Sequence, residues 1–265
     1  MPNTGFNALK TTIQVEYGKI VQLAETNGVA WQREHICKPI FDPIADQYPQ
    51  MGGYLDEADL GLGCGFPVLI AQVQPGEKVL DLGCAAGVDS FIARQAVGEK
   101  GQVTGLDITP ELVERAAKIA ISQGFTNVHF YCTDIEQLPF GDNELDVIIS
   151  NGVFSLLTDR AQVFREMYRV LRPGGRFCVC DLVCKADIPD DIRHQILSFT
   201  GCLNGISHLH DYVDGMKLAG FELVLVSQER AIPIPFIDPK TGQDEYKGLY
   251  AVSLSGVKNP KSIAH

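Results

Sequence analysis

Residues 78–87, KVLDLGCAAG, decide the fold of this chain. The apolar run that begins at Lys78 and ends at Leu82 predicts a short buried strand. Gly83 and Gly87 then form a turn that leads into a helical pattern over 89–97. A glycine has no Cβ, so such a turn lets the backbone approach a ligand closely. The segment therefore predicts a ligand site at the carboxyl end of the first strand.

The same alternation of strands and helices continues along the chain. Helices are predicted from Pro110 to Gly124, where Thr109 is the N-cap, and over 159–171. This rhythm predicts βαβ units and a parallel sheet with right-handed crossovers. Seven strands are expected in total, over 78–82, 102–107, 128–133, 145–150, 176–183, 221–226 and 249–257.

Two segments depart from this rhythm. Residues 1–60 lack it, and we expect them to form a helical extension or lid. Residues 61–265 should form one α/β domain, with a helical insertion at about 187–220 that covers the substrate. The length of the chain suits this organisation.

Three acidic residues lie in or just after the ends of the first three strands. Asp107 comes about 20 residues after Gly87, a spacing at which a carboxylate can accept hydrogen bonds from ribose hydroxyls. Asp134 can accept from an adenine amino group while Ile135 packs on the ring. Asp81 would repel a pyrophosphate, and the third glycine of a dinucleotide motif is absent. An NAD-dependent oxidoreductase is therefore disfavoured.

The order of these motifs resembles the class I methyltransferases. Leu138-Pro139-Phe140 and Arg172-Pro173-Gly174-Gly175 also match that family in order. The resemblance implies a Rossmann-like seven-stranded sheet, S-adenosylmethionine as cofactor and S-adenosylhomocysteine as product. The residues implied to bind the cofactor are Tyr17, Asp81, Gly83, Gly87, Asp107, Ile108, Asp134, Ile135 and Asn151.

Within that class, the flanking motifs resemble the arsenite methyltransferases. Gly63-Cys64-Gly65 and the segment 201–205, GCLNG, carry two of the cysteines of that family. The resemblance implies that the thiolates of Cys64 and Cys202 hold trivalent arsenic, a soft atom. Gly152 stands where a third thiol is expected, and Val29 replaces an early cysteine. An external thiol could complete the arsenic site.

An organic acceptor is the alternative that we weigh most heavily against arsenic. Cys64 and Cys202 would then be scaffold thiols, and His208 or His210, with Asp211 beside them, could act as general base for an oxygen or nitrogen nucleophile. The broad expectation is a methyltransferase with a small-molecule acceptor. An alternative of another class is a non-catalytic sensor or scaffold that binds S-adenosylmethionine.

Composition and charge limit the classes of substrate and the cellular location that we expect for this protein. The formal net charge is −11 and the pI is near 5.0, which disfavours a nucleic-acid substrate. The N-terminus lacks the apolar core of a signal peptide and no run is long enough to span a membrane, so we expect a cytoplasmic protein. The eight cysteines contain no CxxC pair, so no metal site is expected. The oligomeric state is left open.

Overall fold

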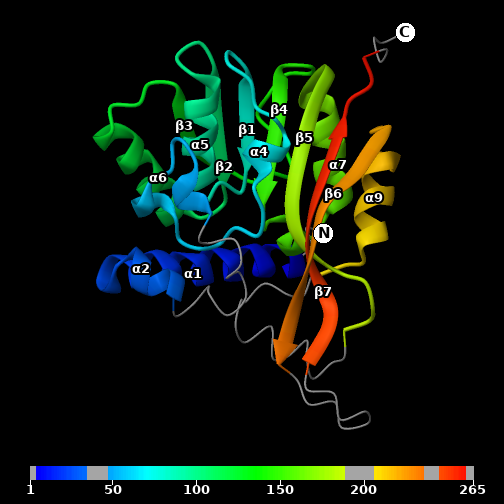
Figure 1. Cartoon of the computed structure of the whole chain (residues 1–265), viewed down its shortest axis with the longest axis horizontal. Helices are drawn as coiled ribbons and strands as arrows, with labels where there is room; N and C mark the ends of the chain where they lie inside the picture. Colours follow the sequence, from blue (N-terminus) through cyan, green and yellow to red (C-terminus); the bar gives the residue numbers. More distant parts are fainter. Residues whose placement is uncertain (1–3, 35–46, 189–205, 236–244, 261–265) are drawn as a thin grey trace.

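The computed structural model describes residues 4–34, 47–188, 206–235 and 245–260 (Figure 1). Within these residues seven strands form one sheet in the order β3-β2-β1-β4-β5-β7-β6. The predicted α/β fold with a seven-stranded sheet is confirmed. The strands are β1 (Lys78–Leu82), β2 (Gln102–Asp107), β3 (Val128–Cys132), β4 (Leu145–Asn151), β5 (Leu171–Cys184), β6 (Leu223–Pro235) and β7 (Glu245–Val257).

The first five strands are parallel, and β1 lies between β2 and β4. Leu80 of β1 pairs with Thr104 of β2 and with Ile148 of β4. Successive strands are therefore added on one side of β1 up to β3 and on its other side from β4 onward. A ligand crevice is expected at the carboxyl ends of β1 and β4, where this order reverses. Strand β7 runs antiparallel between β5 and β6.

Helices cover both faces of the sheet and form two separate apolar cores. One core contains Val79 of β1 with Phe91 and Ile119 from the helices on its face. The other contains the next residue of β1, Leu80, with Phe164 from the opposite helices. This alternation is the two-residue period of a strand buried on both faces. The helices are α4 (Pro67–Ile70), α5 (Val88–Val97) and α6 (Pro110–Ser122) on the first face, and α7 (Arg160–Val170) and α9 (Leu209–Leu218) on the second.

The described part of the N-terminal segment, residues 4–34 and 47–60, contains helices and 3-10 turns. Helix α1 (Thr4–Asn27) is followed by the short α2 (Val29–Gln32) and by the 3-10 turns η2 (Tyr48–Gln50) and η3 (Asp56–Ala58). Figure 1 shows α1 running across the bottom of the sheet. Val21 and Ala24 of α1 pack against Leu112 of α6. None of the helices in the described ranges combines the length and the apolar character needed to cross a membrane.

The last third of the chain differs most from the sequence prediction. The strands predicted over 221–226 and 249–257 are both longer, because β6 and β7 pair as an antiparallel ribbon from Leu223 to Pro235. Of the predicted insertion, the structure describes α9 in its second half. Residues 189–205 lie outside the described part of the chain, and with them the predicted site residue Cys202.

Candidate functional site

A cavity opens at the carboxyl ends of the parallel strands, where α1 crosses them. It contains about 750 Å³ of empty space, including its mouth, which is within the range of small-molecule sites. Helix α1 contributes the side of the cavity that faces the strand ends. The residues predicted to bind the cofactor that line this cavity are Tyr17, Gly83, Asp107, Ile108, Asp134, Ile135 and Asn151.

The turn after β1 is shaped by backbone with positive φ. Gly83 has φ +70° and Ala85 has φ +47°. A Cβ on Gly83 would lie 2.2 Å from Cγ2 of Val153, which lines the cavity. Gly87 does not line the cavity, and its predicted part in cofactor binding stays a prediction. A Cβ there would lie 2.9 Å from the ring of Phe130, so Gly87 lets α5 pack on β3 and is not part of the cavity wall.

Asp107 ends β2 and is held by backbone hydrogen bonds. Its Oδ2 accepts from the N–H of Ala85 at 3.0 Å, and its Oδ1 accepts from the N–H of Thr109 at 2.8 Å. Burial raises the pKa of Asp107, and the hydrogen bonds from the backbone oppose that rise. The carboxylate is thus fixed at the cavity wall and at the same time holds the glycine turn in place.

Asp81 lies behind the glycine turn and is 2% exposed. Ser90 donates a hydrogen bond to its Oδ2 at 2.5 Å. Burial, followed by the charge of Asp89, raises the pKa of Asp81 to about 8. Burial also raises the pKa of Asp89 to about 7. Two buried carboxyl groups near one another favour a cation as their partner.

Asn151 ends β4 and connects this acidic pair to the loop that carries Cys64. Its Nδ2 donates to Oδ2 of Asp89 at 2.8 Å and to Oη of Tyr48 at 2.7 Å. Its Oδ1 accepts from the N–H groups of Cys64 and Gly65 at 2.8 and 3.2 Å. Because Asn151 also lines the cavity, the Cys64 loop is tied to the cavity wall by one amide.

Cys64 is 3% exposed and packs in the core on the α5 face of the sheet. Burial, together with the nearby Asp181 and Cys180, raises the pKa of its thiol well above the ordinary value, and the charge of Arg230 opposes the rise. Among the described residues no group of three potential ligands could hold a metal ion.

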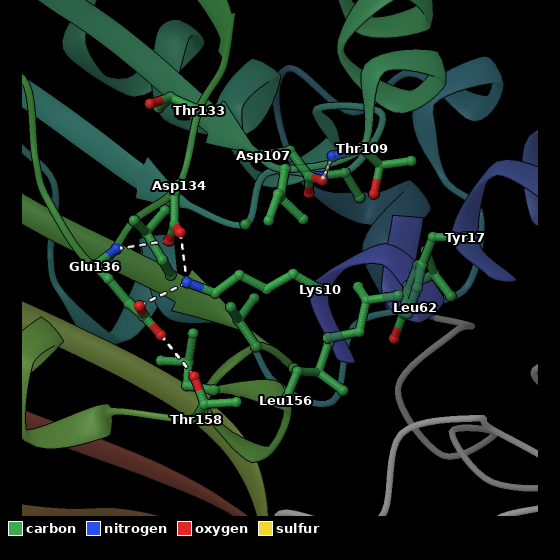
Figure 2. Close-up of a pocket in the computed structure, with 18 of the residues that line it drawn as sticks. Lys10, Tyr17, Leu62, Asp107, Thr109, Thr133, Asp134, Glu136, Leu156 and Thr158 are labelled. Atoms are coloured by element: carbon green, nitrogen blue, oxygen red, sulfur yellow. Dashed lines mark hydrogen bonds and ion pairs between the residues drawn. The ribbon is translucent and has the colours of Figure 1, made fainter. Parts of the chain in front are cut away.

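At the far end of the cavity a lysine of α1 contacts two acidic residues (Figure 2). Lys10 Nζ lies 2.5 Å from Oδ2 of Asp134 and 2.6 Å from Oε2 of Glu136. Thr158 donates to the other oxygen of Glu136 at 2.9 Å. Lys10, Glu136 and Thr158 are not among the site residues predicted from the sequence. The helical spacing of Lys10 and Tyr17, seven residues apart, is the signal that could have placed Lys10 on the same face of α1.

The two predicted histidines do not line the cavity. His208 is the N-cap of α9, and its backbone N–H donates to Oδ2 of Asp211 at 3.2 Å. Its Nε2 lies 3.2 Å from Oδ1 of Asp187, a fully exposed side chain. The side chain of His210 is 71% exposed. The structure gives His208 a capping role, and the general-base role stays a prediction.

Residues 74–247 match a family model described as a methyltransferase domain, which is more than half of the chain. This chain belongs to that methyltransferase family. The resemblance noted from the sequence is thereby confirmed, and the carboxylates at the strand ends lie within the matched residues. S-adenosylmethionine is the cofactor of this class of methyltransferase.

Several relatives of this methyltransferase are named for arsenic. An arsenite methyltransferase of Halobacterium salinarum is 45% identical over 172 residues, covering 65% of this chain and 44% of that protein. A solved arsenic(III) S-adenosylmethionine methyltransferase from Chlamydomonas reinhardtii is 32% identical with a TM-score of 0.63, covering 76% of this chain and 69% of that one. The ubiquinone/menaquinone biosynthesis C-methyltransferase UbiE of Vibrio cholerae is 31% identical over 151 residues, covering 57% of this chain and 58% of that protein. The chain spans about half the length of the arsenite methyltransferases that it matches.

Proposed function

We propose that this chain catalyses methyl transfer from S-adenosylmethionine to a small-molecule acceptor. The observation that carries the proposal is the cavity at the switch point of the sheet, where Asp107 and Asp134 stand at the ends of neighbouring strands and Asp81 lies behind the glycine turn. When bound, the cofactor supplies an electrophilic methyl group on a positively charged sulfur.

The residues present fit this cofactor. Asp81 and Asp89, buried together with raised pKa values, suit the ammonium group of the methionine moiety. Asp107 offers carboxylate oxygens for ribose hydroxyls, and Asp134 offers them for the adenine amino group. Ile108 lines the same cavity and gives the base an apolar contact.

The chain contributes to the transfer mainly by positioning. Displacement at a sulfonium methyl is in line, so most of the rate enhancement can come from holding the acceptor atom about 3–3.5 Å from the methyl carbon. Tyr17 and Leu157 line the cavity with apolar surface, which would limit the access of water to the reacting groups. Asn151 fixes the Cys64 loop beside that wall.

The proposal is tested by calorimetry followed by product analysis. S-adenosylmethionine and S-adenosylhomocysteine are each titrated into the protein, and S-adenosylhomocysteine formation is then measured with arsenite plus a thiol, a quinol and simple amines as acceptors. Binding with turnover of one acceptor supports the proposal. Absence of binding contradicts it, and binding without turnover of any acceptor favours the non-catalytic sensor.

Lys10 should compete with the adenine group for Asp134. The two ion pairs of Lys10 occupy the carboxylates at the adenine end of the cavity. We expect Lys10→Met to bind S-adenosylhomocysteine several-fold more tightly, since an ion pair of this partly exposed kind is worth up to about 1 kcal/mol and there are two to break. Calorimetry measures the change.

The matched control for Lys10 is Lys19→Met, a change on the same helix. Lys19 is exposed and pairs with Glu16 one turn away. The control should leave the affinity unchanged. Weaker binding of S-adenosylhomocysteine by Lys10→Met would show that Lys10 supports the bound cofactor. That result would contradict a competition between Lys10 and the adenine group for Asp134.

Trivalent arsenic is the second candidate for the acceptor. Cys64 is tied to the cavity wall through Asn151, and a relative that is 45% identical to this chain over 172 residues is named an arsenite methyltransferase. Cys64 and Cys202 are the proposed thiolate ligands. Gly152 lines the cavity at the place of the missing third thiol, so a thiol from outside the protein is the proposed third ligand of the arsenic.

Serine variants of the two cysteines test the arsenic candidate. We expect Cys64→Ser and Cys202→Ser each to abolish arsenite methylation, because a hydroxyl is a poor ligand for a soft atom. Binding of S-adenosylhomocysteine should persist in both. Cys132→Ser, at an exposed cysteine, is the control. If both variants keep full turnover with arsenite, arsenic is excluded as a thiolate-bound acceptor.

A further inference from the structure

Tyr48 of η2 is buried, and its hydroxyl lies among polar groups from three other segments. The residue is 4% exposed, and its Oη lies 2.7 Å from the carbonyl oxygen of Gly65 and 3.1 Å from Oδ1 of Asp89. Nδ2 of Asn151 donates to the same Oη at 2.7 Å. One hydroxyl therefore joins the N-terminal segment to the Cys64 loop (62–66), to α5 and to the end of β4.

The Cys64 loop contacts this tyrosine at its hydroxyl and at its ring. A Cβ on Gly63 would lie 3.0 Å from Oη of Tyr48 and 2.8 Å from Nδ2 of Asn151. The ring of Phe66 packs on the ring of Tyr48, with the two centroids 5.0 Å apart. A side chain at position 63 would have to displace the hydroxyl or the amide. The loop thus determines where the hydroxyl of Tyr48 lies.

The hydroxyl of Tyr48 supplies a hydrogen that the amide of Asn151 cannot. Nδ2 of Asn151 carries two hydrogens and lies within 3.0 Å of three acceptors, which are Oη of Tyr48, the carbonyl of Gly65 and Oδ2 of Asp89. The hydroxyl reaches either the carbonyl or the carboxylate. Because an ionised carboxylate is the stronger acceptor, the hydroxyl donates to Asp89 when Asp89 is ionised.

The ionised form of Asp89 depends on these two donors. Asp89 is 5% exposed, and burial raises its pKa to about 7, whereas the hydrogen bonds from Asn151 and Tyr48 lower that pKa. Five titratable groups from the surrounding elements act on Asp89 or are acted on by its charge, and none of these five is a cation: Tyr48, Asp59, Cys64, Asp81 and Cys178. Removal of one donor should therefore shift Asp89 toward its neutral form.

We propose that Tyr48 is a positioning residue of the cofactor site, through which the Cys64 loop holds Asp89 as an oriented carboxylate for the ammonium group of the cofactor. The inference rests on the proposed function. Asp89 does not line the cavity, so it attracts the ammonium group by its negative charge, together with Asp81, and Tyr48 acts on the cofactor through that charge. The N-terminal segment thereby contributes to cofactor affinity in a way that is separate from covering the cavity.

Tyr48→Phe tests this role, because it removes the hydroxyl and keeps the ring that packs on Phe66. Loss of one hydrogen bond to a charged group should raise the pKa of Asp89 from about 7 to about 8. The ammonium group favours the ionised form of Asp89, so the affinity for S-adenosylhomocysteine should fall by up to about fivefold at pH 7 and by less than about twofold at pH 8.5. Calorimetric titration of S-adenosylhomocysteine from pH 6 to pH 8.5 measures this profile.

Two further variants show whether the hydroxyl acts through the acid. Tyr54→Phe is the matched control, because Tyr54 comes from the same segment and its hydroxyl contacts the carboxylates of Asp56 and Asp59. This control should leave the affinity unchanged at each pH. In an Asp89→Asn background, Tyr48→Phe should cause no further loss of affinity, since the group through which it acts has gone. Thermal unfolding of each variant reports whether it is folded.

The outcomes separate this inference from the proposed function. Equal affinities of Tyr48→Phe and the unchanged protein at pH 7, a loss of the same size at pH 7 and pH 8.5, or an undiminished loss in the Asp89→Asn background would each overturn the positioning role. Should Tyr48→Phe fail to fold, Asp89→Asn alone decides, because it must weaken the pH dependence of the affinity and an unchanged profile overturns the inference. Absence of S-adenosylhomocysteine binding by the unchanged protein would count against the proposed function. Binding together with any of the other results would count against the inference only.

Discussion

Replacing Asp81 with asparagine is expected to weaken S-adenosylhomocysteine binding by about two to three orders of magnitude, the cost of removing one partner of a buried ion pair. The same change should stabilise the ligand-free protein at pH 8. Asparagine keeps an oxygen that can accept the hydrogen bond from Ser90 and removes the repulsion between Asp81 and Asp89.

The pH dependence of this stabilisation follows from the raised pKa. Asp81 has a pKa of about 8 in the folded protein and about 3.9 in the unfolded chain, so the folded state binds more protons between these values. Its contribution to stability is fully present below pH 3.9 and is lost as the pH rises through about 8. The advantage of Asp81→Asn over the unchanged protein should therefore grow from pH 5 to pH 9.

Thermal unfolding at pH 5, 7 and 9 and calorimetry at pH 8 measure the two effects. Asp214→Asn, at an exposed aspartate of α9, is the control and should change neither the affinity nor the melting temperature. Normal binding of the product by the variant would show that Asp81 is not the partner of the ammonium group. A variant less stable than the unchanged protein at pH 9 would show that the buried carboxylate of Asp81 does not destabilise the fold.

Replacing Gly83 with alanine is expected to reduce binding of S-adenosylhomocysteine at least tenfold and to destabilise the fold by about 2–5 kcal/mol. The alanine would have to adopt φ +70°, and its Cβ would lie 2.2 Å from Cγ2 of Val153. Relief of this clash must shift the turn or push Val153 into the cavity, so both affinity and stability should suffer.

Gly76 provides a matched control for Gly83. It has φ +87°, and a Cβ there would meet nothing within 4 Å, so Gly76→Ala carries the backbone strain without the clash. Its cost should be limited to about 1–2 kcal/mol, with normal binding. Adding Val153→Ala to Gly83→Ala should recover part of the lost stability. Equal effects at Gly83 and Gly76 would show that the contact with Val153 is unimportant.

The parallel half of the fold could be predicted from the sequence because its signals are local. The strand that ends at Leu82, the glycine turn and the acids at 107 and 134 lie in a fixed order, and parallel strands bring their carboxyl ends to one edge. The strands predicted for β6 and β7 are shorter than the observed ones, because the length of an antiparallel ribbon is set by pairing between distant residues. Local patterning does not record that pairing.

The parts of the site that the sequence missed arise from contacts between distant segments. Lys10 meets Asp134 across 124 residues and Glu136 across 126 residues. Gly87 lies in the expected turn, and a Cβ there would meet the ring of Phe130, which comes from β3. A spacing rule identifies which residue stands in a turn and not which side chain packs against it.

The side-chain amide of Asn151 contacts both the proposed cofactor site and the proposed acceptor loop. Its Nδ2 donates to Asp89, which lies next to Asp81, and its Oδ1 accepts from the backbone N–H of Cys64 in the proposed acceptor loop. A shift of the Asn151 amide on binding of the nucleoside would therefore also move the Cys64 loop, where the acceptor is proposed to bind. Thermodynamic reciprocity then requires the acceptor to alter affinity for the nucleoside by the same factor. The order in which the two ligands are added would change the pathway and not the final occupancy.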